Sequence, residues 1–119
     1  MQTHRFTRHP QPAPFSCSCS HDGGVLTVSP AGELDLSTAP VLDTELRRVA
    51  GGSTDVVVDL RDVSFIDSAG VHVLLRWAGE SARRGRGFRV IPGSERVELV
   101  FAMTGVLQTL GIEERGSLV

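Results

Sequence analysis

The sequence predicts one α/β domain in which a mixed, largely parallel β-sheet carries helices packed against it. Three observations lead to this fold class. The chain has 119 residues, a length that suits one layered core. A short run of β-branched residues at 55–60 is typical of a buried parallel strand. From Ser68 onward the apolar residues recur with a helical period, so strand-like and helix-like segments alternate along the chain.

The first elements form a β-hairpin followed by a helix. Residues 15–20 and 25–34 are predicted as strands, and the turn residues at 21–24 join them. The Ser37-Thr38 pair just before a proline marks a helix start. The apolar face of this helix consists of Leu42, Leu46 and Val49, and Gly51 and Gly52 end it before strand 55–60.

The second half repeats the alternation with short connections. A long amphipathic helix starts at Ser68 and closes at Gly85 and Gly87, and a strand follows at 88–91. Another helix begins at Ser94 and stops near Gly105, and a last turn runs through Leu107 and Leu110. The apolar face of the long helix comprises Val71, Leu74, Leu75, Ala78 and Ala82. Short connections imply right-handed crossovers onto a mostly parallel sheet.

Charge and hydropathy narrow the classes of partner. A net charge of −2 argues against direct binding to nucleic acid, which favours basic surfaces. No apolar run reaches the roughly 20 residues of a membrane-spanning helix, and the first 14 residues lack the apolar centre of a secretory signal. We therefore expect a cytoplasmic protein. Five arginines between Arg76 and Arg89 are interpreted as cations complementing a helix C-terminus rather than as a site for RNA or a membrane.

The two cysteines indicate neither a disulfide nor a metal site. Cys17 and Cys19 lie two residues apart in a predicted strand, where the extended backbone keeps the side chains parallel. No histidines accompany them at zinc-ligand spacing. We expect no cofactor.

Two segments carry a specific resemblance to a known family. They are residues 32–40, GELDLSTAP, and residues 63–71, VSFIDSAGV. In sequence, order and spacing they resemble the two signature regions of the STAS domain, and in particular bacterial anti-sigma factor antagonists. The resemblance covers about residues 15–112, which leaves a flexible N-terminal tail at 1–14 and a C-terminal tail at 113–119.

The resemblance implies a partner-switching cycle. The unphosphorylated protein would bind an anti-sigma factor with serine kinase activity, which would then transfer a phosphoryl group from its own ATP to Ser68 and be released. A phosphatase would reset the cycle. The residues expected at the partner surface are Asp35, Ser37, Thr38, Asp67, Ser68, Ala69 and Gly70.

Physical reasoning about Ser68 supports that role. The serine follows a parallel strand at a helix start, where phosphate oxygens would meet free backbone N–H groups. Phosphorylation adds about −1.5 to −2 charges, next to Asp67 and with Asp35, Asp59 and Asp62 expected nearby. Gly70 would leave room for a partner to approach the serine.

Simpler roles remain open for the same residues. Ser68 could be only the N-cap of its helix. Asp35 could be a turn or capping residue, and Asp67 a local turn carboxylate. Val73 and Trp77, taken as exposed, could form a contact patch or complete the core.

There are two alternative functions, an enzyme and a subunit of a membrane transporter. Ser68, His72 and Asp67 could suggest a hydrolytic triad, but residues four apart on a helix point outward in parallel and Asp67 cannot orient the imidazole. A nucleotide-binding P-loop needs a lysine, and the chain has none. We therefore expect no enzyme. The remaining alternative is a STAS accessory subunit of a membrane lipid transporter, which would act by protein binding without phosphorylation.

Overall fold

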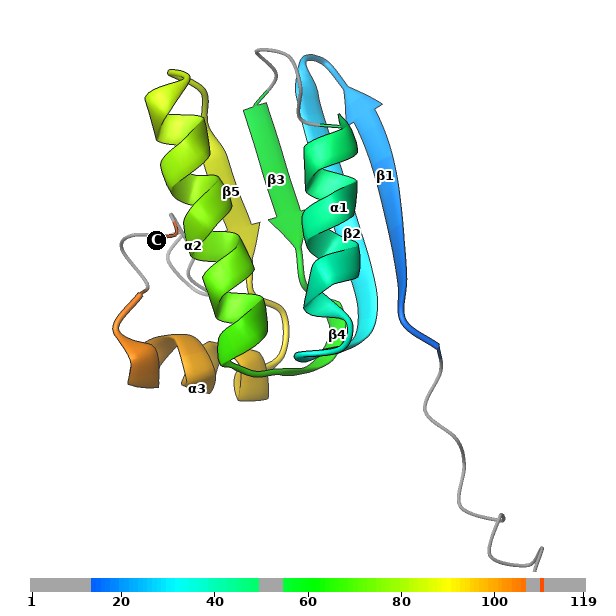
Figure 1. Cartoon of the computed structure of the whole chain (residues 1–119), viewed down its shortest axis with the longest axis vertical. Coiled ribbons are helices and arrows are strands. Elements are labelled where there is room, and N and C mark those ends of the chain that lie inside the picture. The colour runs from blue at the N-terminus through cyan, green and yellow to red at the C-terminus, as the bar shows by residue number, and fades with distance from the viewer. Residues whose placement is uncertain (1–13, 50–54, 107–109, 111–119) are drawn as a thin grey trace, which may run out of the picture.

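The computed structural model describes residues 14–49, 55–106 and 110, in which helices cover one face of a five-stranded sheet (Figure 1). Helices α1 and α2 lie side by side on that face, and α3 crosses near the end where α2 begins. The strands are β1 (Ser16–Asp22), β2 (Val25–Leu34), β3 (Asp55–Asp59), β4 (Asp62–Ile66) and β5 (Phe88–Ile91), and the helices are α1 (Ala39–Val49), α2 (Ser68–Arg83) and α3 (Glu95–Thr104).

The sheet is mixed and largely parallel, which confirms the predicted fold class. Strands β1 and β2 form the antiparallel hairpin, whereas β3 and β4 run parallel to β2, and β5 runs parallel to β3. Strand β3 pairs with residues 25–28 of β2, and β4 pairs with residues 31–34. The strands predicted from the sequence did not include residues 62–66; β4 is a separate strand that extends the pairing to the end of β2.

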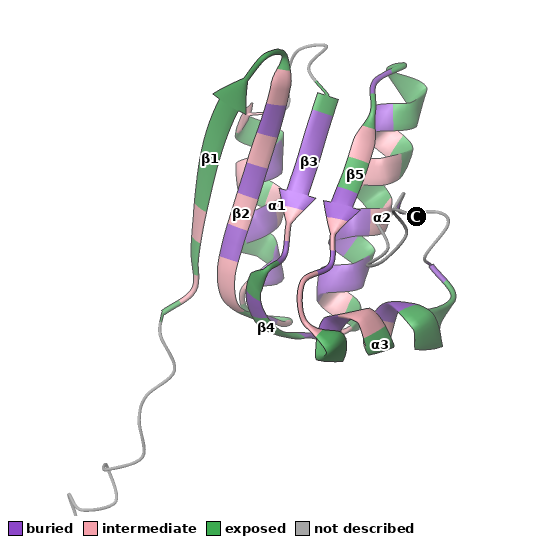
Figure 2. Cartoon of the chain, turned by 180° about the vertical axis from the view of Figure 1, so that it is seen from behind, coloured by how far each residue is buried: buried purple, intermediate pink, exposed green. Residues whose placement is uncertain are grey.

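The core lies between the sheet and helices α1 and α2, where a row of valines crosses three strands. Val28, Val58 and Val90 are in register and fully buried. Figure 2 shows the same pattern as purple bands across the strands. Opposite them, the helices contribute Leu42, Leu46 and Leu74, each without exposed surface. Burying side chains of this size stabilises the fold by roughly 1.5–3 kcal/mol each.

The end of α2 departs from the expected apolar face. Ala82 is exposed, whereas Ser81 is buried. After α2 the chain turns back, with the Arg86 amide donating a hydrogen bond to the Ser81 carbonyl at 3.0 Å. This turn covers Ser81 and leaves Ala82 outside, so the prediction for Ala82 was wrong.

The outer limits of the predicted elements are only partly described. Gly51, Gly52 and Leu107 lie outside the described residues, as do both expected tails except Pro14. Within the described part, Ser94 is the N-cap of α3, and Gly105 ends it in the left-handed conformation with φ 72°. Both agree with the predicted limits of that helix.

Candidate partner-binding and phosphorylation site

The parallel pairing of β2 with β4 brings the two signature segments together. Leu34 and Ile66 are register partners at the ends of their strands, and the Asp67 amide donates to the Leu34 carbonyl at 3.2 Å. The loop after β2 and the turn after β4 therefore lie next to each other. In open α/β sheets this edge, at the carboxyl ends of the strands, is where functional groups gather.

Asp35 organises the loop after β2. Its Oδ1 accepts hydrogen bonds from the Ser37 hydroxyl at 2.8 Å, the Ser37 amide at 3.0 Å and the Thr38 amide at 3.1 Å. The hydrogen bond from Ser37 is the largest cause of a lowered pKa for the Asp35 carboxyl. Thr38 Oγ1 donates to the Glu33 carbonyl at 2.7 Å and accepts from the Asp35 amide at 2.9 Å. Asp35 is thus a turn residue, with its Oδ2 making no hydrogen bond within the described part of the chain.

Asp67, not Ser68, is the N-cap of α2. Its backbone is extended, and its Oδ1 accepts from the amides of Ala69 at 2.9 Å and Gly70 at 3.4 Å. The alternative that Ser68 serves as the cap is therefore wrong, because Ser68 is already the first helical residue. It is exposed, and its hydroxyl makes no hydrogen bond with any described residue.

Gly70 leaves room on the inside of the protein rather than toward a partner. It is buried, and a Cβ there would lie 2.8 Å from Leu34 Cγ and 2.9 Å from Ile66 Cγ1. Such distances are well inside van der Waals contact. The missing side chain lets α2 begin directly against the ends of β2 and β4, so our explanation of Gly70 as an approach path was wrong.

Fewer of the expected carboxylates lie close to Ser68 than the sequence suggested. Asp62 begins β4, whereas Ser68 comes after the other end of this strand. The strand from Asp62 to Ile66 is itself about 13 Å long, so Asp62 lies far from the serine. Asp59 pairs with Arg61 through a 2.7 Å contact, and this partner is the first cause of its lowered pKa. The carboxylates that the pairing of β2 with β4 brings close to Ser68 are those of Asp67 and of Asp35 in the loop after β2.

A hollow of about 330 Å³ lies between the Asp35 loop, α1 and α2, and Ala69, the residue after Ser68, is part of its lining. Leu36, at its edge, is 77% exposed. Val73, expected to be exposed, is only 7% exposed and belongs to the core. The residues that line the hollow are Leu36, Ala39, Pro40, Asp43, Ala69, His72, Val73 and Arg76.

The Ser68, His72 and Asp67 triad is not assembled. Asp67 Oδ1 is bound by two backbone amides, and His72 lies one turn further along α2 with its side chain at the hollow. The orienting carboxylate that a hydrolytic histidine needs is therefore engaged elsewhere.

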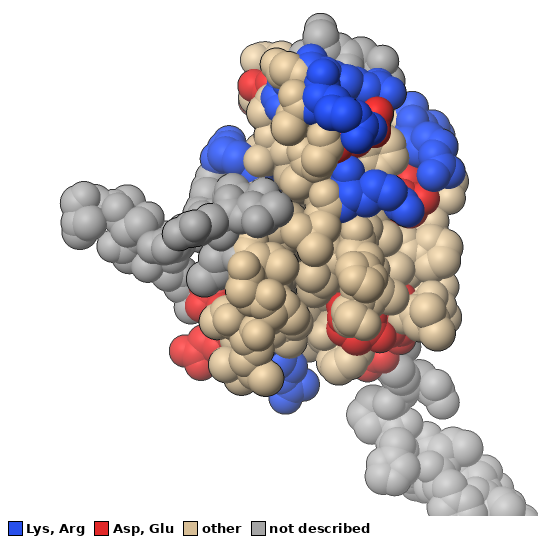
Figure 3. Space-filling view, turned by 60° about the vertical axis from the view of Figure 1, so that its left-hand side comes forward, with Lys and Arg blue, Asp and Glu red and all other residues tan. Residues whose placement is uncertain are grey.

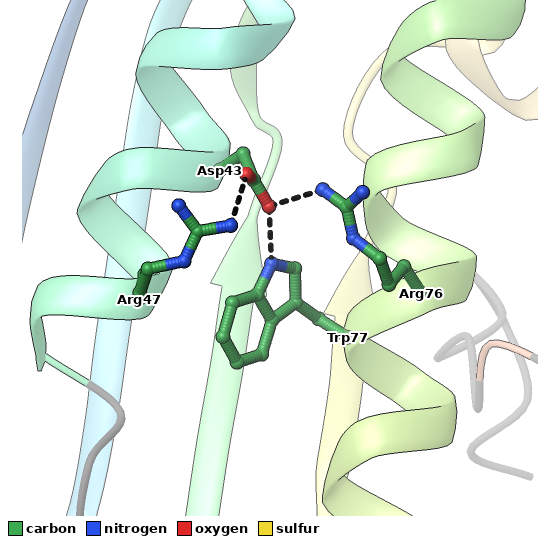
Figure 4. A network of polar contacts seen from close by, with 4 residues as sticks. All are labelled: Asp43, Arg47, Arg76 and Trp77. Carbon is green, nitrogen blue, oxygen red and sulfur yellow. Dashed lines mark hydrogen bonds and ion pairs between the residues drawn. The ribbon is translucent and has the colours of Figure 1, made fainter.

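Asp43 of α1 binds three side chains and joins α1 to α2 (Figure 4). Its Oδ1 accepts from Trp77 Nε1 at 2.7 Å and from Arg76, and its Oδ2 accepts from Arg47 at 2.9 Å. Trp77 is thus half-buried rather than exposed, and its indole is held by a hydrogen bond to Asp43. Sequence reasoning missed this network, although the spacing of Asp43 and Arg47 suits a helical ion pair.

The Asp43 network makes stability dependent on acid pH. Burial disfavours the Asp43 carboxylate, but the hydrogen bonds from Trp77 and Arg76 outweigh it and lower the pKa below the ordinary 3.8. The contribution is complete above that value and is lost as pH falls through the folded-state pKa. We expect Asp43→Asn to flatten the fall in unfolding free energy below about pH 4, measured by urea denaturation. Asp62→Asn is the control, and an equal flattening in both variants would contradict the assignment.

The cap predicts a second stability effect. We expect Asp67→Ala to lower the unfolding free energy by about 1 kcal/mol, whereas Asp67→Asn, which still accepts both amide hydrogen bonds, should lose much less. Chemical denaturation of the two variants measures the difference. Equal losses would show that the charge of Asp67, not its hydrogen bonding, supports the helix.

Cys17 and Cys19 are free thiols in the structure. Burial is the main cause that raises the pKa of the Cys17 thiol to about 12 and that of Cys19 to about 11. Cys19 Sγ also donates to Glu45 Oε2 at 3.2 Å. Protonated thiols are poor metal ligands, and no group of metal-binding side chains occurs among the described residues.

The described helices include none with the length and apolar composition needed to cross a membrane.

The sheet order, the paired loops and the exposed serine at a helix start define a STAS domain. The sequence matches the STAS domain family over residues 18–115, and the chain belongs to this family.

Its relatives place the chain more narrowly. The anti-sigma-B factor antagonist of Bacillus subtilis (strain 168) is 31% identical over 90 residues, which cover 76% of this chain and 83% of that protein. The crystal structure of an anti-sigma factor antagonist from Mycobacterium paratuberculosis superimposes with a TM-score of 0.79 at 26% identity, covering 87% of this chain and 89% of that one. By these homologues the chain falls in the anti-sigma factor antagonist family, whose members are regulators and not enzymes.

Two more distant structures share the fold alone. The phosphorylated form of the Bacillus cell fate determinant SpoIIAA matches with a TM-score of 0.62 at 18% identity, over 87% of this chain and 95% of that one. The murine Slc26a9 anion transporter matches with a TM-score of 0.67 at 16% identity, over 78% of this chain but 16% of the transporter. Because one fold serves a regulator and a transporter, function must be argued from the site.

Proposed function

We propose that the chain binds an anti-sigma factor with serine kinase activity while Ser68 is unphosphorylated, and releases it once Ser68 is phosphorylated. Capture of the anti-sigma factor would free a sigma factor and so regulate transcription. The observation that carries the proposal is the exposed Ser68 hydroxyl, free of hydrogen bonds to described residues, beside the Asp35 loop. The names of the relatives and the phosphorylated form of SpoIIAA support it.

The chemical step needs only a nucleophile from this chain. Ser68 Oγ would attack the γ-phosphorus of ATP bound by the kinase, lose its proton to a base of the kinase and displace ADP. Exposure of the serine suits this transfer, because the kinase must bring both the phosphate and the base to it. A separate phosphatase would hydrolyse the phosphoserine and restore the binding form.

The cap of α2 explains why the added charge would act on the partner. Asp67 already accepts hydrogen bonds from the Ala69 and Gly70 amides. These two amides are therefore not free to donate to the phosphate. From the sequence we expected free N–H groups at this helix N-terminus. Phosphorylation adds about −1.5 to −2 charges next to the Asp67 carboxylate. A partner surface that fitted the neutral serine would then face this additional negative charge. Like charges brought together at an interface cost several kcal/mol.

The proposal places the exchange of partners in the cytoplasm, where sigma factors and their kinases act, and assigns no direct contact with nucleic acid.

The proposed function is tested by incubating the full chain with candidate anti-sigma factor kinases from its own genome and labelled ATP, followed by phosphopeptide mapping. We expect a single labelled peptide containing Ser68. Stable binding to a transporter ATPase, with no label entering from any kinase, would instead favour the transporter-subunit alternative.

A further inference from the structure

A second hollow continues the first along the groove between α1 and α2. It has a volume of about 260 Å³ and is lined by Arg47, Arg76, Trp77, Glu80 and Arg84. Arg76 lines both hollows, so they lie on either side of this residue. We call the two hollows together the α1–α2 trough. Ser68 begins α2 beside one end, and Arg84 follows α2 at the other, about 24 Å along the helix axis.

The far end of the trough carries an excess of positive charge. Asp43 is shared by Arg47 and Arg76, and Glu80 is shared by Arg83 and Arg84. Three of these arginines line the trough with the two carboxylates, whereas Arg83 lies outside its lining. The side chains of Arg47 and Arg84 are 65% and 48% exposed. A guanidinium has five N–H donors, and these pairs leave several of them for a further acceptor.

The end of the trough near Ser68 has a different character. Five of its eight lining residues are apolar, and Leu36 among them is 77% exposed. The other three are Asp43, His72 and Arg76. Figure 3 shows most of the arginines gathered over the upper end of the molecule, with mainly uncharged surface below them and acidic side chains at the lower end. The trough is therefore asymmetric along its length, with a cationic end and an apolar end.

We propose that the α1–α2 trough docks an amphipathic segment of the kinase, with acidic side chains at the arginine end and apolar side chains beside Ser68. The inference rests on the proposed function and adds the surface that orients the kinase. Its basis is charge complementarity: net positive charge at one end selects an acidic partner. A segment of four to five helical turns spans about 24 Å, and its two unlike ends fit in one direction only.

The two ends should affect different rate constants. Exposed charges mainly steer association, whereas a packed apolar contact mainly slows dissociation. The probe is the purified kinase that labels Ser68, with binding to the full chain followed by surface plasmon resonance. We expect the double variant Arg47→Gln, Arg84→Gln to slow association at least fivefold at low salt and less than twofold at about 0.5 M salt, where screening is strong. We expect Leu36→Ser to speed dissociation at least fivefold, with little change in association.

A matched control removes the same charge elsewhere. The double variant Arg61→Gln, Arg96→Gln neutralises two exposed arginines outside the trough, and association should change less than twofold. Equal slowing by both double variants would mean that net charge alone steers the kinase and would overturn the proposal. So would unchanged kinetics of the trough variants while Ser68→Glu still weakens binding, an outcome that leaves the proposed function standing. If no kinase labels Ser68, the proposed function fails first and the trough proposal with it.

Discussion

Ser68→Ala is expected to abolish the transfer of label from ATP, because alanine lacks the oxygen that would accept the phosphoryl group. The fold should be preserved. Asp67 holds the cap of α2, so the mutation removes a hydroxyl that bonds to no described residue. We expect a change in unfolding free energy within about 0.5 kcal/mol, typical of an exposed surface position. This is smaller than the loss of about 1 kcal/mol that a capping serine would give.

The experiment follows incorporation of labelled phosphate into the wild type and the variant, with circular dichroism as the check on folding. Ser64→Ala is the matched control, since Ser64 is an exposed serine on β4, close in sequence but outside the turn. It should be labelled like the wild type. Label entering Ser68→Ala at the wild-type rate would show that another residue is the acceptor.

Ser68→Glu is expected to weaken kinase binding at least tenfold, equivalent to about 1.4 kcal/mol. The variant adds one negative charge beside Asp67, at the place where the kinase must also present the phosphates of ATP. Phosphoserine carries roughly twice that charge, so the glutamate should reproduce only part of its effect. Circular dichroism should not change, because an acidic residue is favourable in the first turn of a helix.

Ser68→Gln separates charge from size in this test. Glutamine has nearly the shape of glutamate but no charge, so it should retain most of the affinity that glutamate loses. Isothermal titration calorimetry of both variants against the kinase measures the difference. A loss as large with glutamine as with glutamate would mean that bulk at position 68, rather than charge, weakens the complex.

The sequence predicted the elements whose signals are local. The hairpin follows from alternating residues around Gly23 and Gly24, and α2 follows from the helical period after Ser68. The meeting of the two signature segments could be expected from the family resemblance, and the Leu34 and Ile66 register explains it physically.

Features that depend on contacts between distant segments could not be predicted in this way. Strand β4 is short and does not alternate strictly, so only its pairing with β2 defines it. Asp67 and Ser68 are both good N-cap residues, and the extended backbone at Asp67 decides between them. The sequence does not show whether Gly70 faces the core or a partner, because that depends on how closely α2 approaches Leu34.

The most direct test of phosphorylation-controlled binding compares two forms of the same chain against one kinase. The full-length protein is phosphorylated, Ser68 is verified as the modified residue, and the affinities of both forms for the kinase are measured by titration calorimetry. We predict that the phosphorylated form binds more weakly than the unphosphorylated form, and more weakly than Ser68→Glu. Equal affinity of the two forms would contradict it, because charge at position 68 would then not control binding.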